Sequence, residues 1–470
     1  MNAIIFTAVW GIIMMFGGVF FRSARTATLA AITGSLLVFG VNAAELIQEH
    51  GFFEINVNNL LVFNSFNLAF IGLMLLATIL YFLLSGRDIE KVGTNVSEYY
   101  ALIFFVLCGV SITATFNSLL TMFIGIEILS IPLYVLTGSD KKNLKSNEAA
   151  LKYFLMGSFS TGILLMGIAF IYGGNTSGSF QLDTINLGEG KLPVMIAIGL
   201  VFTLIALAFK VSAAPFHFLT PDVYDGAPTV FTSFMATVVK AAGFFTFIRL
   251  FEHAFGRVHP QWQTLIAVVT AATLVIGNLT AVFQQSVKRM LAYSSIAQAG
   301  FMLLSLFALN DLAKEGLVLY AAAYSFASIG LFGILTRMQD YTIEGFNGLA
   351  RQQPGIAICA AIFLLSLTGI PLTAGFQGKF MMLVAALKDG HHTWLVVLAV
   401  LMAAVSAFYY FRVLQAMFFR NPIVSAEGTV SGGIASESAT TGFEIVLYVL
   451  AFLVILIGIF PGVVTDWLHY

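Results

Sequence analysis

The stretch 209–229, FKVSAAPFHFLTPDVYDGAPT, places ionisable side chains in a region that is otherwise hydrophobic. It contains Lys210, Pro215 and His217, together with two aspartates. An ionisable group inside a membrane span costs roughly 2.5 to 3.5 kcal/mol on insertion scales, so such groups are functional candidates. Proline lacks a backbone N–H and clashes with the preceding turn, so we predict that a helix running in from residue 193 breaks here. Transporters build ion sites from a broken helix with a cation beside the break.

A second break is predicted in the apolar run 355–388, which is too long for one straight membrane helix. The run contains Gly369 and Pro371, and Lys379 follows them in GIPLTAGFQGKF. The glycines around this lysine let backbone and water approach it. We therefore expect Lys379 to have a functional role.

Two further ionisable residues lie deep in apolar runs. Glu127 is near the middle of TMFIGIEILSIPLYVLTG, and Lys240 has a full turn or more of apolar residues on either side in FMATVVKAAGFFTF. A glutamate and a lysine in a mostly dry interior can load or release a proton when their spacing changes. The alternative for Glu127 and its lysine is a static buried ion pair that holds helices together.

Lys152 and His217 have functional and structural interpretations of similar weight. Lys152 opens a predicted span one turn after Glu148, so it is either part of a charge relay or an interfacial lysine paired at i, i+4. His217 lies just past Pro215, where neutral imidazole either relays a proton from Lys210 or bonds carbonyls freed at the break.

For the other charged residues the structural interpretation is favoured. Asp222 and Asp225 in TPDVYDGAP fit a turn near prolines. Lys288 fits the positive-inside rule alone. Arg249 and Arg412 lie near span ends, where they can extend to the membrane surface as anchors.

The composition is that of a membrane protein. Of 470 residues, 59% are hydrophobic and 10% are charged, whereas soluble domains carry about 25% charged residues. The net charge of −1 suggests no nucleic acid partner. Cys108 and Cys359 lie far apart in apolar runs, which argues against a disulfide or a metal site. No Walker motif, GxGxxG motif or cysteine cluster is present, so nucleotide hydrolysis, flavin binding and iron–sulfur chemistry have no evident site.

The hydrophobic runs predict an all-α polytopic membrane protein with about fourteen transmembrane helices. The runs lie at 3–21, 26–43, 66–84, 99–114, 117–137, 148–173, 193–213, 228–252, 262–283, 289–308, 313–337, 355–388, 393–419 and 442–466. An even number of spans puts both termini on one side. The segment 421–441, rich in Gly, Ser, Thr and Ala, is predicted to be a flexible cytoplasmic loop.

Basic residues in the loops predict the orientation. Twelve lie in odd-numbered loops: Arg22, Arg25, Arg87, Lys91, Lys141, Lys142, Lys145, Lys288, Arg289, Arg337, Arg351 and Arg420. Four lie in even-numbered loops: Lys191, Arg257, Lys314 and Lys388. The odd loops are therefore expected in the cytoplasm and both termini outside.

The two predicted breaks fall in the seventh and twelfth spans, five apart. An odd offset makes two five-helix units enter the membrane from opposite sides, which is an inverted repeat. We therefore predict a first repeat at 99–253, helices 4–8, and a second at 254–420, helices 9–13. Residues 1–98, helices 1–3, and 421–470, a loop and helix 14, are expected to be peripheral.

These motifs resemble the antiporter-like subunits of respiratory complex I, the proton-pumping NADH:quinone oxidoreductase. The residues that carry the resemblance are GIEILSIPLYVLTG, EAALKYF, FKVSAAPFHFLTPDVYDGAPT, VVKAAGFFTFIRLF, NLTAVFQQSVKRMLAYSSIAQAGFM and GIPLTAGFQGKF. They cover roughly residues 60 to 420. PDVYDGAP and the predicted fourteen spans look most like the branch called subunit N, the bacterial counterpart of mitochondrial subunit two.

The resemblance implies roles for individual residues. In that family the broken seventh and twelfth helices form two half-channels. Lys210 resembles the pumping lysine and Glu127 its glutamate partner, while Lys240 resembles the lysine that links the halves. Lys379 resembles the lysine of the exit half-channel. The other two matches are Lys152, to a lysine of the sixth helix, and His217, to a histidine seen widely in the family.

The resemblance further implies a proton-translocating subunit in the membrane arm of complex I, in the bacterial inner membrane. This chain would have no cofactor of its own, with NADH, FMN, iron–sulfur clusters and quinone in partner subunits. Its partners would be other membrane-arm subunits and the lipid bilayer. Two alternatives are a subunit of a multisubunit cation/proton antiporter, which shares this fold, and a scaffold whose buried lysines are replaceable.

Overall fold

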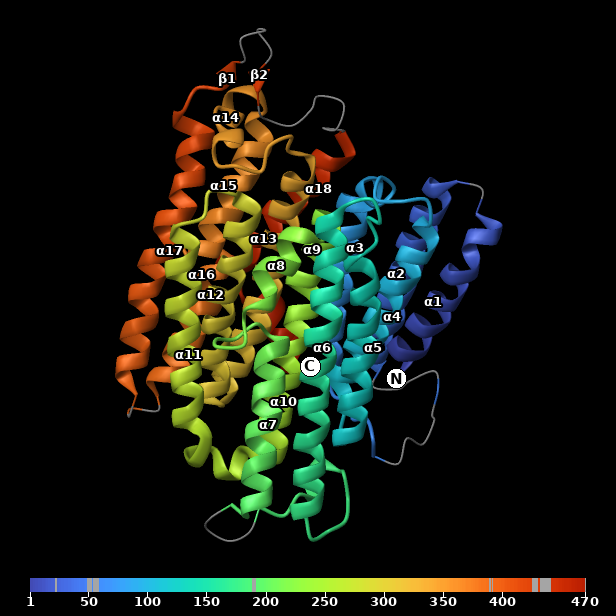
Figure 1. Cartoon of the computed structure of the whole chain (residues 1–470), viewed down its shortest axis with the longest axis vertical. Helices are drawn as coiled ribbons and strands as arrows, with labels where there is room; N and C mark the ends of the chain where they lie inside the picture. The colour runs from blue at the N-terminus through green and yellow to red at the C-terminus, as the bar shows by residue number, and fades with distance from the viewer. Residues whose placement is uncertain are drawn as a thin grey trace.

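The structure, a computed structural model, is a bundle of long apolar helices. It describes residues 1–21, 23–48, 53, 59–187, 192–388, 390, 392–424, 430–431 and 441–469. Within these ranges, 11 helical segments are long and apolar enough to cross a membrane, and three shorter apolar helices accompany them. Most of the long helices run along the long axis of the molecule (Figure 1).

The elements follow one another in this order. The chain begins with α1 Asn2–Phe20, α2 Ala24–Gln48, α3 Ser65–Ile89, α4 Val96–Thr115, α5 Leu119–Thr137 and α6 Leu144–Gly174. It continues with η1 Leu182–Thr184, α7 Val194–Lys210, α8 Leu219–Gly226, α9 Thr229–Phe234, η2 Met235–Val239, α10 Lys240–Phe255 and η3 Gly256–Val258. Next come α11 His259–Val282, α12 Val287–Ala308, α13 Asp311–Arg337, η4 Glu344–Phe346 and α14 Leu349–Gln352. The last elements are α15 Pro354–Thr368, α16 Ala374–Leu387, α17 Thr393–Phe419, β1 Ile423–Val424, β2 Val430–Ser431, α18 Thr441–Ile459, α19 Gly462–Thr465 and η5 Asp466–His469.

Each of the fourteen predicted spans falls on a helix or on a pair of helices separated by a break. The structure is helical apart from the short antiparallel pair β1 and β2, which confirms the all-α class. The stretch Thr229–Val282 is helical throughout, and the short 3-10 turn η3 separates α10 from α11 within it. The number of membrane crossings stays a prediction.

Both predicted breaks are present. The first is the non-helical segment 211–218 between α7 and α8, so the helix ends at Lys210, five residues before Pro215. The second lies between α15 and α16, where Gly369 adopts a left-handed φ of +93° that ends α15.

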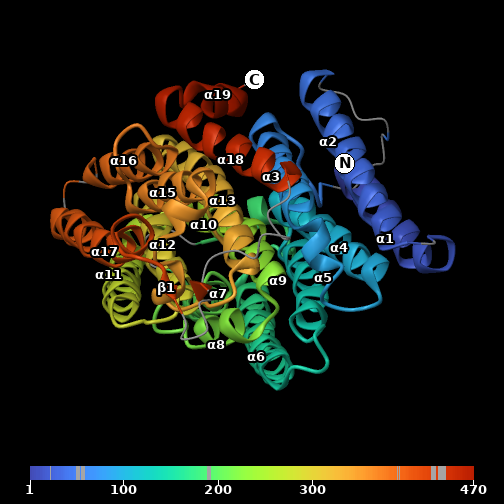
Figure 2. The same cartoon turned by 90° about the horizontal axis from the view of Figure 1, so that it is seen from above.

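The centre of the bundle is formed by helices that carry small residues. In an apolar stretch of 18 residues, all residues of α13 and 94% of those of α12 are buried. Alanine, serine and glycine on these helices allow close approach of backbones. A Cβ added at Gly277 of α11 would lie 2.5 Å from the backbone nitrogen of Ala297 in α12, so only glycine fits there. Seen from above, α10 and α13 lie in the interior, and α1 and α2 form one edge (Figure 2).

The expectation that helices 1–3 and 14 are peripheral is wrong for α3. In its apolar stretch of 18 residues, 78% of the residues are buried. The corresponding share is 28% in α1, 33% in α2 and 39% in α18. The Phe70 ring of α3 stacks on Phe245 of α10 with ring centroids 4.0 Å apart, and α3 also packs against α13 and α18. Hydropathy measures apolar length and not position in the bundle, so it could not separate α3 from its neighbours.

Two sequence predictions involve residues outside the described ranges. Arg22 and Lys191 entered the orientation argument, and both lie outside them. Most of the predicted loop 421–441 also lies outside, at 425–429 and 432–440. The described part of that loop contains β1 and β2, which pair Ile423 with Ser431.

One buried ion pair joins the ends of α3 and α13. The Nε atom of Arg337 lies 3.1 Å from Oδ2 of Asp88, and both side chains are less than 5% exposed. The guanidinium also lies 3.6 Å from the ring centroid of Phe443 on α18. Lys91 contacts the same carboxylate at 3.1 Å but is 66% exposed. Arg337 was predicted to be a loop residue, and its burial is a finding of the structure.

Asp88→Asn is expected to destabilise the protein, because it leaves the Arg337 guanidinium buried without its charged partner. Removing one partner of a buried pair costs about 3–5 kcal/mol. Thermal unfolding of the purified protein in detergent should show a clearly lower midpoint. Lys91→Ala is the control, since it removes only the exposed partner and should leave the midpoint nearly unchanged. Equal midpoints for both variants would contradict a stabilising role of the Arg337–Asp88 pair.

Candidate functional site: lysines beside two broken helices

Lys210 is the last residue of α7 and lies at the first break. Its Nζ atom donates a hydrogen bond to Oγ of Ser130 on α5 at 2.9 Å. Ser130 follows Glu127 by three residues, so both side chains lie on one side of α5. The break and α5 together hold this lysine close to the predicted glutamate.

The predicted contact between Glu127 and Lys210 is indirect. Oε1 of Glu127 accepts a hydrogen bond from Oγ1 of Thr161 on α6 at 2.9 Å. No ion pair within 4 Å joins Glu127 to Lys210 in the described part of the chain, and Ser130 is the group that contacts the lysine. The sequence predicted the two residues as partners, whereas in the structure Lys210 of α7 contacts Ser130, and Glu127 lies one turn before Ser130 on α5.

Lys240 is buried at the start of α10, directly after the π-helical turn η2. Its Nζ atom donates to the carbonyl oxygen of Ser295 at 2.9 Å and to Oγ of the same residue at 3.0 Å. Ser295 belongs to α12. These acceptors are neutral, so a change in the charge of Lys240 breaks no ion pair.

A small cavity touches both Lys210 and Lys240. Its volume is about 40 Å³, which exceeds the roughly 10–15 Å³ that one water molecule requires. Its polar lining residues besides the lysines are Tyr153, Ser212, Thr220 and Tyr224. We call this space the inner cavity, and its size and lining suit water that bridges the two amines.

Lys379 lies on α16 and is 4% exposed. Its Nζ atom donates to the carbonyl oxygens of Leu367 at 2.6 Å and Thr368 at 3.3 Å. These are the last two residues of α15, whose C-terminal end carries a partial negative charge. The Phe301 ring is also close, with its centroid 4.4 Å from Nζ. The Lys379 ammonium therefore donates hydrogen bonds to carbonyl oxygens that lost their helical partners at the second break.

Polar side chains of α12 connect the surroundings of Lys240 and Lys379. Gln298, one turn after Ser295, donates through Nε2 to the Leu367 carbonyl at 3.0 Å and to the Tyr410 hydroxyl at 3.1 Å. Its Oε1 atom accepts a hydrogen bond from Tyr320 of α13. Gln298 and Lys379 thus share one carbonyl oxygen. The sequence prediction missed Gln298, although a glutamine in the apolar run SSIAQAGFM was a usable signal.

His217 lies in the first break but outside the lining of the inner cavity. Its ring is stacked on Phe218 with centroids 4.8 Å apart. The buried Nδ1 atom has no hydrogen-bond partner within the described residues. A proton relay through His217 stays a prediction.

Lys152 lies at the protein surface and not in the row of buried lysines. Its Nζ atom is 2.8 Å from Oε1 of Glu148, which confirms the predicted i, i+4 pair. It is also 2.8 Å from Oδ2 of Asp222 on α8. The turn predicted at Asp222 and Asp225 is wrong, because these residues lie within α8 and form ion pairs across helices. The prolines at 221 and 228 suggested a turn, but Pro221 occupies the first turn of the helix, where proline is tolerated.

Two basic residues that were expected at the membrane surface are buried, namely Lys288, attributed to the positive-inside rule, and Arg249, interpreted as an anchor. Lys288 is 5% exposed and donates to the carbonyl oxygens of Asp225 and Ala227, each at 2.8 Å. Arg249 is also 5% exposed, and its Nε atom donates to the Phe116 carbonyl at 2.7 Å. Both satisfy carbonyls at helix ends, a partner that sequence position alone did not reveal. Arg412 is consistent with the anchor interpretation, since it reaches the Val282 carbonyl at 2.8 Å from a partly exposed position.

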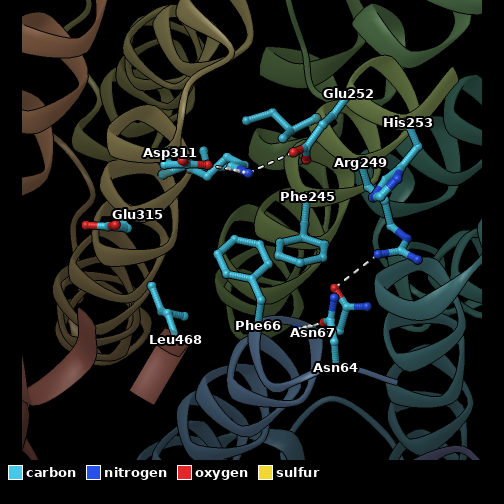
Figure 3. Close-up of a pocket in the computed structure, with 13 residues that line it drawn as sticks. Asn64, Phe66, Asn67, Phe245, Arg249, Glu252, His253, Asp311, Glu315 and Leu468 are labelled. Atoms are coloured by element: carbon cyan, nitrogen blue, oxygen red, sulfur yellow. Dashed lines mark hydrogen bonds and ion pairs between the residues drawn. The ribbon is translucent and has the colours of Figure 1, made fainter. Parts of the chain in front are cut away.

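A further cavity contains none of the predicted site residues. It has a volume of about 400 Å³ and lies among the ends of α3, α10 and α13. Figure 3 shows Glu252 and His253 of α10 on one side of it and Asp311 and Glu315 of α13 on the other. Lys314 bridges the two sides, at 2.7 Å from Glu252 and 2.8 Å from Asp311. Among the described residues, no group of three or more His, Cys, Asp or Glu side chains could hold a metal ion.

The fold and the broken helices correspond to a known class of membrane proteins. The family described as NADH:quinone oxidoreductase/Mrp antiporter, transmembrane region, matches residues 116–406, which is more than half of the chain. A chain in the structure of the Mrp complex from Dietzia sp. has the same fold, with a TM-score of 0.84 at 17% identity, covering 99% of this chain and 95% of that one. The class is therefore that of antiporter-like membrane subunits.

Curated relatives define the family within this class. NADH-quinone oxidoreductase subunit N of Cytophaga hutchinsonii is 37% identical over 99% of both chains. The subunit N of Flavobacterium psychrophilum is 36% identical over 100% of both. A chain of respiratory complex I from Thermus thermophilus with bound aureothin aligns with a TM-score of 0.81 at 30% identity, covering 99% of this chain and 98% of that one. The chain belongs to the family of NADH-quinone oxidoreductase subunit N.

Gln298→Leu is expected to slow proton transfer between Lys240 and Lys379, because it removes the polar group that lies between their surroundings. A loss of about 1.4 kcal/mol at this step slows it about tenfold. The measurement is NADH-driven proton pumping in membrane vesicles, normalised to assembled complex. Gln263→Leu is a matched control, since Gln263 is also buried but makes one long bond to Phe307 and touches none of the lysines. Normal pumping by Gln298→Leu would exclude this residue from the pathway.

Proposed function

We propose that this chain is a proton-translocating membrane-arm subunit of NADH-quinone oxidoreductase. The observation that carries the proposal is the row of ionisable side chains Glu127, Lys210, Lys240 and Lys379 inside an apolar bundle. Each is held by hydroxyl or carbonyl groups, and a cavity and Gln298 link consecutive members. Ionisable residues at such positions mark ion and proton pathways.

The geometry supports a stepwise transfer. A proton that reaches Lys210 is bound on its amine, which donates one hydrogen bond to Ser130. Glu127 lies one turn before Ser130 on α5. Water in the inner cavity carries the proton to Lys240. The path continues past Ser295 and Gln298 to Lys379 at the second break. Like charges repel strongly at low dielectric, so loading one lysine favours release from the next.

Charge pairing between Glu127 and Lys210 sets the direction of proton transfer along the row of ionisable side chains. Movement of Glu127 away from Thr161 and toward Lys210 stabilises the ammonium, and movement away releases the proton. We propose that conformational or electrostatic changes in neighbouring subunits drive this spacing. NADH oxidation, FMN, iron–sulfur clusters and quinone reduction then belong to partner subunits, and this chain has no redox centre of its own.

The protein is a multi-pass membrane protein. We propose that it lies in the bacterial inner membrane with both termini on the periplasmic side. The excess of basic residues in the odd-numbered loops supports this orientation. We also propose the division into two inverted five-helix units at 99–253 and 254–420. The two breaks support it, because each lies in the fourth helix of its unit.

A cation/proton antiporter subunit is the alternative within the same class. The two functions separate by the complex in which the chain occurs. We expect the chain to come out of its native membrane in a large assembly that oxidises NADH and reduces quinone. Isolation with other hydrophobic subunits that exchange sodium for protons, without NADH activity, would support the antiporter.

Lys210→Ala and Glu127→Ala are each expected to abolish or strongly reduce proton pumping while the complex still assembles. When the amine or the carboxylate is removed from the apolar interior, no group remains there to bind the proton. Each increase of about 1.4 kcal/mol in the transfer barrier slows transfer about tenfold. Pumping is measured as NADH-driven acidification of vesicles, with assembly checked on native gels. Lys142→Ala, at an exposed loop lysine, is the control and should pump normally. Near-normal pumping in both site variants would refute the proposed pair and favour a scaffold.

Lys240 is expected to require a titratable amine and not merely a positive charge. Lys240→Ala and Lys240→Arg should both impair transfer between the two halves, since guanidinium does not release its proton. Turnover and pumping are measured together in coupled vesicles, so that the ratio of protons to NADH reports the coupling. Rescue by Lys240→Arg would mean that a fixed charge is sufficient.

A further inference from the structure

The helix α8 separates two cavities. Thr220, Val223 and Tyr224 face the inner cavity with Lys210 and Lys240. Asp222 and Asp225, on other sides of the same helix, face a second cavity of about 190 Å³ that we call the outer cavity. A single helix of eight residues therefore stands between the outer cavity and the proposed pathway.

The outer cavity is lined by charges of both signs. Its lining residues are Lys145, Glu148, Ala149, Lys152, Asp222, Asp225, Gly226 and Arg289. It lies at the surface, because the side chains of Lys152, Asp222 and Arg289 are 40% to 43% exposed. Protons and water thus reach one face of α8 without crossing apolar material.

Ion pairs tie α8 to two other helices. Lys152 of α6 lies 2.8 Å from Asp222, and Arg289 of α12 lies 3.8 Å from Asp222 and 3.9 Å from Asp225. The contact of Lys152 with Glu148 lies within α6 and does not reach α8. Because the three pairs to α8 are half-exposed, water screens them, and they can open and close readily.

The two ends of α8 are held differently. At its C-terminal end, Lys288 is buried and binds the carbonyls of Asp225 and Ala227. Gly226 also lies against α6, where an added Cβ would meet the Lys145 carbonyl oxygen at 2.7 Å. The N-terminal end follows the non-helical segment 211–218, in which Ser212 has a positive φ of +65°. Motion of α8 would therefore pivot at its C-terminal end.

We propose that α8 is a gate between the outer cavity, where protons enter, and the inner cavity, and that the ion pairs of Asp222 with Lys152 and Arg289 hold it closed. When these pairs open, water from the outer cavity reaches Thr220, Ser212 and then Lys210. The identity of the transferred species rests on the proposed function. The gate itself is a statement about water access and has its own test.

The test measures access to the inner face of α8 in the assembled complex. Thr220→Cys places a thiol on the inner cavity in a background where the buried Cys108 and Cys359 are replaced by alanine. A small, charged methanethiosulfonate is added from the cytoplasmic side, and the rate of modification is followed by mass spectrometry. Lys142→Cys, at an exposed loop position, gives the rate of an open site.

Asp222→Asn is expected to raise the modification rate about three- to tenfold, since each exposed ion pair shifts an equilibrium by a few fold. Asp222→Glu keeps the charge and should retain slow modification. Glu148→Gln is the matched control, because it removes the other carboxylate that contacts Lys152 without releasing α8. Its rate should equal that of the parent.

Two results would overturn the gate. One is the same rate for Asp222→Asn and Glu148→Gln, and the other is a parent rate as fast as that of Lys142→Cys. Modification requires no turnover, so the labelling result is independent of pumping. Loss of pumping in Lys210→Ala without a labelling difference for Asp222→Asn leaves the proposed function intact and removes the gate alone.

Discussion

The structure depends on one constraint, which is that every backbone polar group inside hydrocarbon must find a partner within the protein. A broken helix frees carbonyl groups that water cannot reach, and the chain satisfies them with cations. Lys379 occupies the end of α15, Lys288 the end of α8, and Arg249 the end of α4. Arg412 does the same at the end of α11. These contacts also place positive charge at the negative end of each helix dipole.

The same constraint distinguishes structural cations from candidates for proton transfer. A guanidinium at a helix end keeps its charge, so Arg249 and Arg412 are suited to permanent capping. Lysine can lose its proton, so Lys379 can both cap α15 and take part in transfer. Lys210 and Lys240 are held instead by serines, on α5 and α12, which correspond to the second helix of each predicted repeat.

The sequence was sufficient for the helices and the breaks because these depend on local composition. Apolar length set the spans, and Pro215 and Gly369 marked the two interruptions. Contacts between side chains on different helices could not be predicted from local composition. That Lys288 binds carbonyls of α8, or that Lys210 donates to Ser130 while Glu127 accepts from Thr161, depends on how helices pack, and one sequence does not contain that information. The burial of α3 was misjudged for the same reason, since hydropathy does not distinguish lipid from protein as the apolar neighbour.

Two of the ion-pair clusters that join helices of the bundle lie away from the row of lysines. Arg337 and Asp88 join the ends of α3 and α13, and Lys314 joins Glu252 to Asp311 at the cavity of about 400 Å³. Inside the row, Lys240 and Lys379 contact neutral oxygens, so gain or loss of a proton breaks no structural ion pair. In the proposed function, stability and proton transfer thus use different charges. A pump needs this separation, because groups that must change charge in every cycle cannot also be the ones that keep the helices together.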